Sequence, residues 1–283
     1  MGEILRELSM TTDYVTYLGD PKPYLERIAE AGFTHIHWCH EWNTTHIYSD
    51  NEISNIQTWL QEFDLKLLDL HAPHGEGMGW GAGGAIERSA AVKLLKNRLG
   101  MTARLSGGAI VVHLPNAPST LLKGDFYYDS LQRSLDVLWQ LAEKYSIKIA
   151  IENMDDDDFL DIDWLFERYN DDFLGLCYDS GHGNLGRPGL DNLERYKGRL
   201  VSIHIHDNDG TQDRHNLPFS GTVDWVRLSK IIASSSYKGC VSLEANMRGL
   251  DISESEYLRE AYQTAAKLEK MIQSERQALT AGK

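Results

Sequence analysis

Six hydrophobic segments of this chain are each followed at once by a side chain that could bind a metal ion. They read LLDLH, AIVVH, IKIAIE, LGLCYD, LVSIH and CVSLE, and the polar residues are His71, His113, Glu152, Asp179, His204 and Glu244. His182 and His206 follow the fourth and fifth segments within three residues. The chain has 42 Asp and Glu and 11 His among 283 residues, so roughly one position in five would carry such a side chain by chance. Six in succession therefore indicate a polar site.

The hydrophobic segments have the character of buried parallel strands, because each is short, rich in Ile, Leu and Val, and bounded by turn residues. The pattern predicts strands near 4–10, 33–38, 65–71, 108–114, 147–153, 173–179, 199–206 and 238–245. It predicts helices near 22–31, 52–64, 86–106, 127–145, 160–169, 190–197, 223–234 and 254–277. Eight strands alternating with eight helices are typical of an α/β fold, the (β/α)8 TIM barrel, and we expect one such domain over 1–283.

A doubly wound open sheet is the alternative for a chain that alternates strands and helices. No Gly-rich phosphate-binding fingerprint follows the first expected strand. Polar residues at six strand ends would also not meet at the single switch point of an open sheet, whereas a closed barrel gathers them at one end. We therefore expect the barrel.

Composition predicts an ordinary hydrophobic core in a reducing compartment. The hydrophobic fraction is 42%, and no apolar stretch approaches the roughly 18 residues needed to span a membrane. The first residues lack the basic flank and apolar centre of a secretory signal. Cys39, Cys177 and Cys240 are few, odd in number and unclustered, so we expect buried free thiols and a cytoplasmic protein.

The net charge of −14 argues against broad, non-specific binding to nucleic acid. Glu41, Glu76 and a run of four Asp at 155–158 follow expected strands, at the end where the metal-competent residues gather. Negative charge there would repel a polyanion, although the Asp run would equally suit a loop before a helix N-terminus. We expect a small-molecule partner rather than nucleic acid or a membrane, and a homo-oligomer stays open.

Three carboxylates and one imidazole at four strand ends could bind one divalent metal ion. They are Glu152, Asp179, His204 and Glu244. This set suits Mn²⁺, Zn²⁺, Co²⁺ or Mg²⁺ and includes no thiolate. His182, Asp213 and His215 lie close enough in the sequence to extend it. Each histidine alone could be a structural or surface residue, so the combination carries the prediction of a metal site.

The motifs around these residues resemble those of the xylose isomerase-like TIM barrels, a family of sugar isomerases, ketose 3-epimerases, inosose-processing enzymes and endonuclease IV. The resemblance extends to Glu244 and is most specific in IEN at Glu152, DSGH at Asp179 and HIHDNDGTQDRH at His204. In the epimerase branch, it implies that Glu152, Asp179, His204 and Glu244 hold one divalent metal ion. The two glutamates would also act as acid and base on opposite faces of a sugar.

The endonuclease branch is the alternative, with a trinuclear zinc site whose nine ligand positions are all filled in this chain. They are His71, His113, Glu152, Asp179, His182, His204, Asp213, His215 and Glu244. However, HAPHGEGMGWGAGG lacks the Tyr and Arg residues with which these endonucleases enter the DNA stack, and HEWNTTH offers no Arg. We therefore expect a sugar, sugar phosphate or keto-inositol isomerase or epimerase ahead of a metal-dependent phosphoesterase. A lyase, a dehydratase or a non-catalytic sugar-binding barrel is a further alternative.

An isomerase of this kind needs a metal ion, a proton carrier and substrate contacts. Removing a proton next to a carbonyl creates an enediolate, which a chelating divalent ion would stabilise while Glu152 and Glu244 move the proton. Candidate substrate contacts are His71, His113, His182, Trp38, Trp80 and Arg214. Trp38, Trp42 and Trp80 could form an apolar wall against the sugar, or could simply pack under loops.

A phosphorylated substrate would need a site for its phosphate. Residues 220–222 (Ser-Gly-Thr) precede the helix expected after the seventh strand, where barrels often bind phosphate through free backbone N–H groups. The same residues could serve as an ordinary helix N-cap. The nearest basic side chains are Arg187, Arg214 and Arg248.

Overall fold

A computed structural model describes residues 7–75, 78–115, 125–154, 159–185 and 189–281, in which parallel strands alternate with helices. The strands are β1 (Leu8–Thr11), β2 (His35–Trp38), β3 (Lys66–His71), β4 (Ala109–Val112), β5 (Lys148–Glu152), β6 (Leu174–Asp179), β7 (Leu200–His204) and β8 (Val241–Leu243). The α-helices are α1 (Lys22–Glu30), α2 (Asp50–Glu62), α3 (Ala85–Arg104), α4 (Asp125–Tyr145), α5 (Leu160–Phe166), α6 (Ser180–Leu185), α7 (Gly189–Tyr196), α8 (Trp225–Ala233) and α9 (Glu254–Ala281), with a short 3-10 turn, η1 (Lys197–Arg199), before β7.

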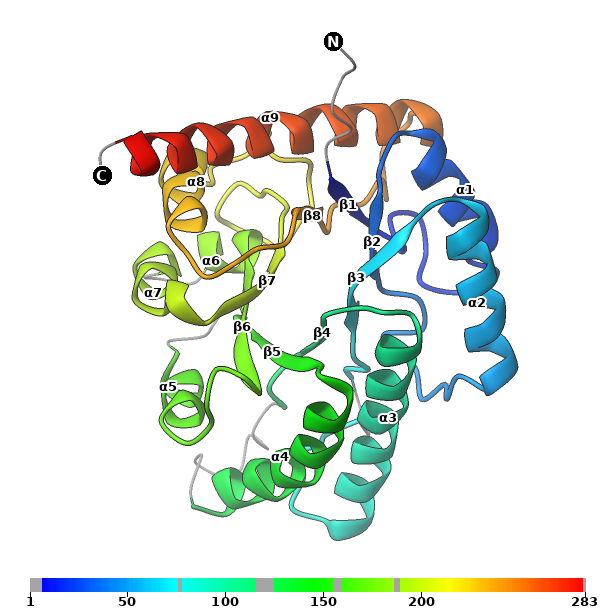
Figure 1. Ribbon diagram of the computed structural model, residues 1–283, viewed down its shortest axis with the longest axis vertical. Helices are drawn as coiled ribbons and strands as arrows, with labels where there is room; N and C mark the ends of the chain where they lie inside the picture. Colours follow the sequence, from blue (N-terminus) through cyan, green and yellow to red (C-terminus); the bar gives the residue numbers. More distant parts are fainter. Residues whose placement is uncertain (1–6, 76–77, 116–124, 155–158, 186–188, 282–283) are drawn as a thin grey trace.

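The strands form a ring that the helices surround, with α9 lying across one side (Figure 1). Their order is β7-β6-β5-β4-β3-β2-β1-β8, and every pairing along it is parallel. A bridge between Ile205 and Leu243 closes the seam between β7 and β8. There the Ile205 N–H donates to the Ser242 carbonyl (2.9 Å), and the Glu244 N–H donates to the Ile205 carbonyl (3.0 Å). The fold is a (β/α)8 TIM barrel, which confirms the predicted closed barrel.

Alternation along the strands decides which side chains face the barrel interior. All six residues of β6 are buried, but on two different sides. Leu176 and Tyr178 belong to the large core between the strands and the helices. Cys177 instead packs with Val111 and Ala150 of neighbouring strands in a separate small cluster. Because side chains alternate with a period of two, the strand-end residues that continue this inner row also face the interior.

The expected elements overlap the observed ones, and most bounds differ by only a few residues; three differences bear on the site. The first strand, expected at 4–10, lies at Leu8–Thr11, and residues 1–6 are outside the described chain. The helix expected from 223 begins at Trp225, with Asp224 rather than residues 220–222 as its N-cap. The helix α6 has no counterpart among the expected helices, because its sequence SGHGNL is rich in glycine and reads as a turn.

Some predicted features cannot be placed. Glu76, the Asp run at 155–158 and Arg187 all lie outside the described residues. Among the helices that are described, none combines the length and the apolar character needed to cross a membrane.

Candidate metal centre and active site

Two glutamates from distant parts of the chain meet at one imidazole inside the barrel. Glu152, the last residue of β5, places Oε1 3.0 Å from His204 Nδ1 at the end of β7. Glu244, directly after β8, places Oε2 2.8 Å from the same nitrogen, without the alignment of a hydrogen bond. Glu152 and His204 are buried, and the Glu244 side chain is 12% exposed. The structure thus brings together three of the four predicted ligands directly.

Two histidines from β3 and β4 surround the second oxygen of Glu152. His113 Nε2 lies 3.0 Å from Glu152 Oε2, and His71 Nε2 lies 3.6 Å from it. The two rings contact each other, with 3.1 Å between their Nε2 atoms. Ligand atoms of these three residues all lie within 4.8 Å of one another, as a shared cation would require. Two of the five predicted additional ligands, His71 and His113, therefore lie beside Glu152.

The fourth predicted ligand, Asp179, lies in a second group of side chains. Its Oδ2 is 2.9 Å from His206 Nε2, and its Oδ1 accepts a hydrogen bond from the backbone N–H of His182 (2.6 Å). The His182 ring Nδ1 lies 3.7 Å from both Asp179 Oδ1 and Glu152 Oε1, so this histidine spans the two groups. His206 is absent from the predicted ligand set, although its i,i+2 spacing from His204 puts it on the same strand face.

The loop after β7 adds Asp213 and His215 to this second group. Asp213 Oδ2 lies 3.0 Å from His215 Nε2 and 3.5 Å from His182 Nε2. The His215 ring stacks on His206, with 4.0 Å between the ring centroids, and its Nδ1 donates to the Glu244 carbonyl (2.6 Å). Asp213 and His215 are 32% and 24% exposed, so they lie closer to solvent than the glutamates.

Asp207 holds this loop in place from a fully buried position. Its carboxylate accepts hydrogen bonds from the backbone N–H groups of Gly221 (2.9 Å) and Val223 (3.2 Å) and from the Trp225 indole (3.0 Å). The Thr222 N–H donates to the Asn208 carbonyl (2.8 Å). The N–H groups of Gly221 and Thr222, considered for phosphate binding, are therefore already paired within the protein.

Opposite charges set the protonation of the inner residues when no metal is bound. Burial would raise the pKa of Glu152, but His204 and His113 hold it well below its usual range. Burial would also raise the pKa of Glu244, and His204 again holds it well below its usual range. Burial lowers the pKa of His204, but Cys177, Glu244 and Glu152 raise it well above its usual value. Both glutamates are therefore ionised around a protonated His204.

Burial and opposite charges also set the pKa values of Asp213 and His215 in the second group. Burial lowers the pKa of His215, but its hydrogen bond with Asp213 and the negative charges of Glu244, Asp213 and Asp179 together outweigh this and raise the pKa to about 9. Burial would raise the pKa of Asp213, and hydrogen bonds from His182 and His215 lower it far below its usual value instead. His74, which packs against His113, differs, because burial and the neighbouring histidines lower its pKa to about 4.

The predicted aromatic contacts take different places. Trp38 is fully buried among core residues, and its indole N–H donates to Tyr48 Oη (3.0 Å). Trp80 is buried and donates to the His113 carbonyl (3.0 Å), so it supports the backbone of a candidate ligand. Trp42 lies nearest the site, with 5.3 Å between its ring centroid and that of His71.

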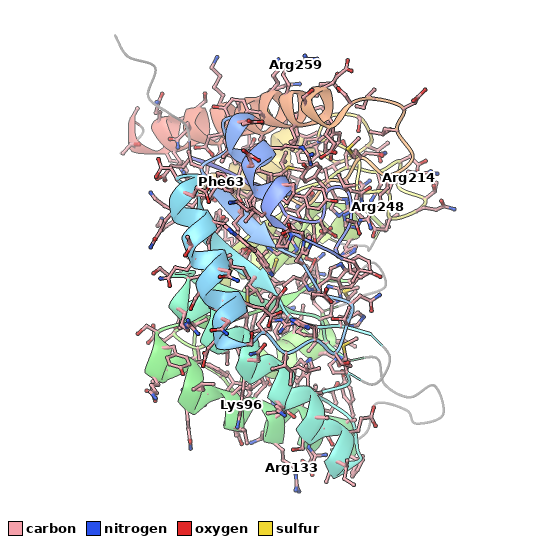
Figure 2. All side chains as sticks on the ribbon, turned by 90° about the vertical axis from the view of Figure 1, so that its right-hand side faces the viewer. Phe63, Lys96, Arg133, Arg214, Arg248 and Arg259 are labelled. Carbon is pink, nitrogen blue, oxygen red and sulfur yellow. The ribbon has the colours of Figure 1, made fainter. Side chains whose placement is uncertain are left out.

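Arg214 and Arg248, two of the candidate phosphate-binding arginines, lie toward the same side of the molecule (Figure 2). Arg214 Nε pairs with Asp209 (3.0 Å), and Arg248 lies 3.7 Å from Asp13. Both guanidinium groups are thus engaged by carboxylates and remain partly exposed.

The residues present fit a divalent cation. Among the described residues, Glu244 Oε2 is a buried atom that faces the other candidate ligands and has no hydrogen-bond partner. Buried polar atoms are rarely left unpaired in folded proteins, and a bound ion commonly satisfies those that are. Imidazoles and carboxylates crowded within 4.8 Å supply the ligand types that Zn²⁺, Mn²⁺ and Co²⁺ accept.

Known proteins resemble this chain along most of its length. The uncharacterised protein y4fM of Sinorhizobium fredii is 33% identical over 278 residues, covering 89% of each chain. A D-tagatose 3-epimerase-like protein of known structure shares the fold with a TM-score of 0.77 and 18% identity, over 96% of this chain and 99% of that one. The IolI protein, solved with a bound zinc atom, shares it with a TM-score of 0.69 and 20% identity, over 95% and 98%. The family model of the xylose isomerase-like TIM barrels matches residues 25–270, and the chain belongs to this family.

Proposed function

We propose that this protein is a divalent-metal-dependent isomerase or epimerase of sugars or related polyols. The observation that carries the proposal is the meeting of two largely buried glutamates, Glu152 and Glu244, at one imidazole. They come from β5 and from the end of β8, so a substrate between them would face a carboxylate on either side. One carboxylate could take a proton from a carbon and the other could return it from the opposite face.

Glu152, Asp179 and Glu244 are the carboxylates we assign to the metal ion, with an imidazole from the end of β7. The predicted His204 contacts both glutamates, while His206 contacts Asp179. A bound divalent ion supplies a Lewis acid that stabilises negative charge on substrate oxygens.

The protein's own side chains would orient the two glutamates and contact the substrate. His113 and His204 each lie 3.0 Å from Glu152 and hold its carboxylate in one orientation. The backbone hydrogen bond from Glu244 to Ile205 fixes the other glutamate on the barrel seam. His113 and His182 are each 9% exposed, so they border the open side and are the contacts we propose for substrate oxygens. Trp42, beside His71, is the aromatic side chain best placed for a sugar C–H face.

The structural neighbours support the substrate class and the cofactor. One is described as D-tagatose 3-epimerase-like, and the IolI structure contains zinc. Both likenesses are at low identity, so they add to the argument from the paired glutamates and do not replace it.

The test is hydrogen exchange in heavy water. The metal-loaded protein is incubated with ketoses, ketose phosphates and keto-inositols, and deuterium is sought at the carbon next to the carbonyl. The label should appear even where net conversion is small, because exchange does not need a favourable equilibrium. It should vanish with a chelator and in Glu244→Gln, which keeps the shape but removes the proton acceptor, and should persist in Glu26→Gln, an exposed position on α1. A panel without metal-dependent exchange would leave the proposal without support.

A metal-dependent phosphoesterase is the second candidate, because the positions implied by the endonuclease resemblance do gather in space. His71 and His113 flank Glu152, and Asp213 and His215 adjoin Asp179 through His182 and His206. The net charge of −14 opposes a nucleic-acid substrate, so we expect duplex DNA to bind no better than roughly 10⁻⁴ to 10⁻⁶ M at physiological salt. Chelator-sensitive incision of an abasic-site oligonucleotide would reverse this order.

A further inference from the structure

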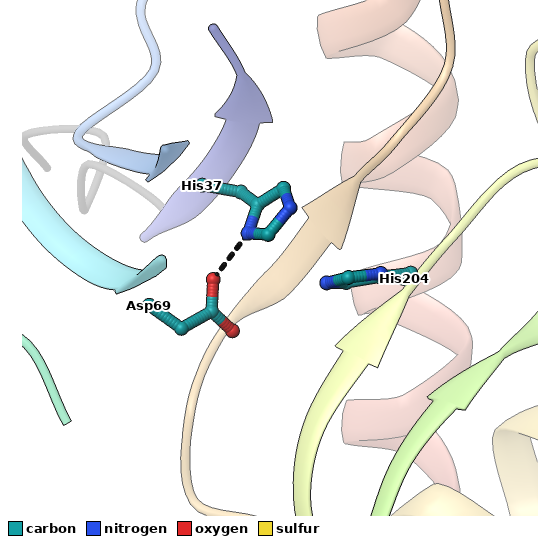
Figure 3. A group of neighbouring side chains, drawn as sticks. All are labelled: His37, Asp69 and His204. Atoms are coloured by element: carbon teal, nitrogen blue, oxygen red, sulfur yellow. Dashed lines mark hydrogen bonds and ion pairs between the residues drawn. The ribbon is translucent and has the colours of Figure 1, made fainter. Parts of the chain in front are cut away.

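Two unassigned side chains at the end of β2, His37 and Cys39, point into the barrel. They are two residues apart and therefore share a face, which is also the face of the inner row of polar residues. His37 is the register partner of Asp69 on β3, and its Nδ1 lies 2.6 Å from Asp69 Oδ1. The His204 ring also lies against His37, with 4.2 Å between ring centroids (Figure 3). His37 and Asp69 are both buried.

Asp69 determines which nitrogen of His37 is available. A carboxylate can only accept, so His37 Nδ1 carries the hydrogen and donates it, and Ser202 donates to the other carboxylate oxygen. The Nε2 atom then faces the barrel interior, and among the described residues it has no hydrogen-bond partner. A histidine held by a carboxylate on one nitrogen, with the other nitrogen free, is the arrangement seen at metal-binding histidines.

Glu244 Oε1 and Cys39 Sγ lie opposite that free nitrogen. His37 Nε2 is 3.8 Å from Glu244 Oε1, which is too long for a hydrogen bond. Cys39 Sγ is 3.9 Å from the same oxygen, at the long limit of a thiol contact. Ligand atoms of the three residues all lie within 4.8 Å of one another.

These spacings suit a bridging cation. With zinc bonds near 2.1 Å to N or O and 2.3 Å to S, tetrahedral ligands stand about 3.4 Å apart for an N–O pair and about 3.6 Å for an S–O pair. Closing the two gaps to Glu244 Oε1, 3.8 and 3.9 Å, needs shifts of only a few tenths of an ångström. An ion therefore accounts for the unpaired Nε2 of His37, buried against two further ligand types, better than a hydrogen bond does.

We propose that His37 Nε2, Cys39 Sγ and Glu244 Oε1 form a second metal position between β2 and β8, with Asp69 orienting His37. The thiolate makes this position select Zn²⁺ or Co²⁺ over Mg²⁺. As the Sγ–metal bond forms, the thiol proton leaves to solvent. Glu244 would then contribute Oε1 to this second position and Oε2 to the metal position described above. The proposal concerns metal binding alone and does not depend on the reaction.

Cobalt spectroscopy tests the thiolate ligand. Protein loaded with Co²⁺ should show near-ultraviolet thiolate-to-cobalt charge-transfer absorption, lost in Cys39→Ser and in His37→Gln. Both variants should also bind one metal ion fewer per chain, measured by elemental analysis. Cys240→Ser, directly before β8, is the matched control and should keep the band. Absence of the band in the wild-type protein, or its persistence in Cys39→Ser, would overturn the proposal, as would its loss in Cys177→Ser alone.

Anomalous diffraction from zinc-soaked crystals of the wild-type protein tests the position without any substitution. We expect a peak between His37 and Glu244, separate from any peak at Asp179. Zinc bound only beside Asp179 and Glu152 would refute the second position while leaving the proposed function intact. Conversely, a thiolate band in a protein that exchanges no substrate proton would sustain this inference and defeat only the proposed reaction.

Discussion

Replacing Glu152 by alanine should reveal how much of the metal-free protein's stability comes from its site. The carboxylate is 1% exposed and lies 3.0 Å from both His113 and His204, with His71 and His182 at 3.6 and 3.7 Å. Removing one partner of a buried pair costs about 3–5 kcal/mol, because the remaining charge is left uncompensated. At about 2.1 cal/mol/K per residue, a chain of 283 residues unfolds with an entropy of about 0.6 kcal/mol/K. The Tm in the presence of a chelator should therefore fall by about 5–8 °C.

The same variant should also lose the stabilisation that metal provides. A ligand present at about 100 times its Kd stabilises the folded state by about 2.7 kcal/mol, which is about 4–5 °C for this chain. We expect this rise in the wild-type protein with Mn²⁺, which thiolate ligands do not favour, and little or none in Glu152→Ala. With Zn²⁺, the variant should keep only the part of the rise that the second position of His37, Cys39 and Glu244 supplies. Differential scanning calorimetry, with chelator and with metal, measures both effects.

Glu26→Ala is the matched control, since Glu26 is exposed on α1 and should change the Tm by less than about 1 °C. A Glu152→Ala protein that is as stable as the wild type in chelator would show that repulsion from Glu244 cancels the attraction of the histidines. A variant that keeps the full metal-induced rise would refute Glu152 as a ligand.

Three further outcomes are expected. In chelator, the protein should lose stability as pH rises from about 6.5 towards 9. The pKa of His215 is about 9 in the folded protein, so its protonation stabilises the fold fully only below the pKa of about 6.5 that it has in the unfolded chain. Metal binding in this pH range should release protons, which an indicator dye in weak buffer would measure. Asp207→Ala should lower the Tm, since each buried donor it leaves unpaired costs about 1–3 kcal/mol, and should weaken the metal-induced rise by freeing the loop with Asp213. His113→Ala should reduce metal content only mildly if the ion is held by the four predicted ligands, whereas a loss as severe as in Glu152→Ala would favour the multinuclear phosphoesterase.

The closed barrel, and the meeting of most candidate site residues at one end of it, could be predicted from the same sequence pattern. Hydrophobic runs of strand length with a polar last residue, repeated along the chain, have a single solution in which all the strand ends meet, and that solution is a closed parallel barrel. His71, His113 and Glu152 come from three successive strands, and the structure places them in contact as this argument requires.

Side-chain direction within a strand is harder to predict. Trp38 is expected near the substrate because it ends a strand, yet it lies between His37 and Cys39, which both face inward. Alternation therefore turns Trp38 towards the helices, where its indole reaches Tyr48. The register of β2 against β3 also shifts between Ile36 and His37, and nothing in the sequence marks this irregularity. The pairing of His37 with Asp69 could not be foreseen for that reason.

The sequence pattern alone cannot decide between His204 and His206 as the metal ligand, whereas the structure distinguishes their surroundings. Residues two apart on a strand share a face but stand about 6.6 Å apart along it, so alternation admits both and ranks neither. In the structure the two histidines belong to different groups of side chains. His204 contacts Glu152 and Glu244, whereas His206, farther along the chain, contacts Asp179. Among these described side chains, only His182 lies near both groups, with its Nδ1 3.7 Å from Glu152 Oε1 and 3.7 Å from Asp179 Oδ1. A metal ion bound by Glu152 and Asp179 together would therefore lie beside His182, between the group of side chains that includes His204 and the group that includes His206.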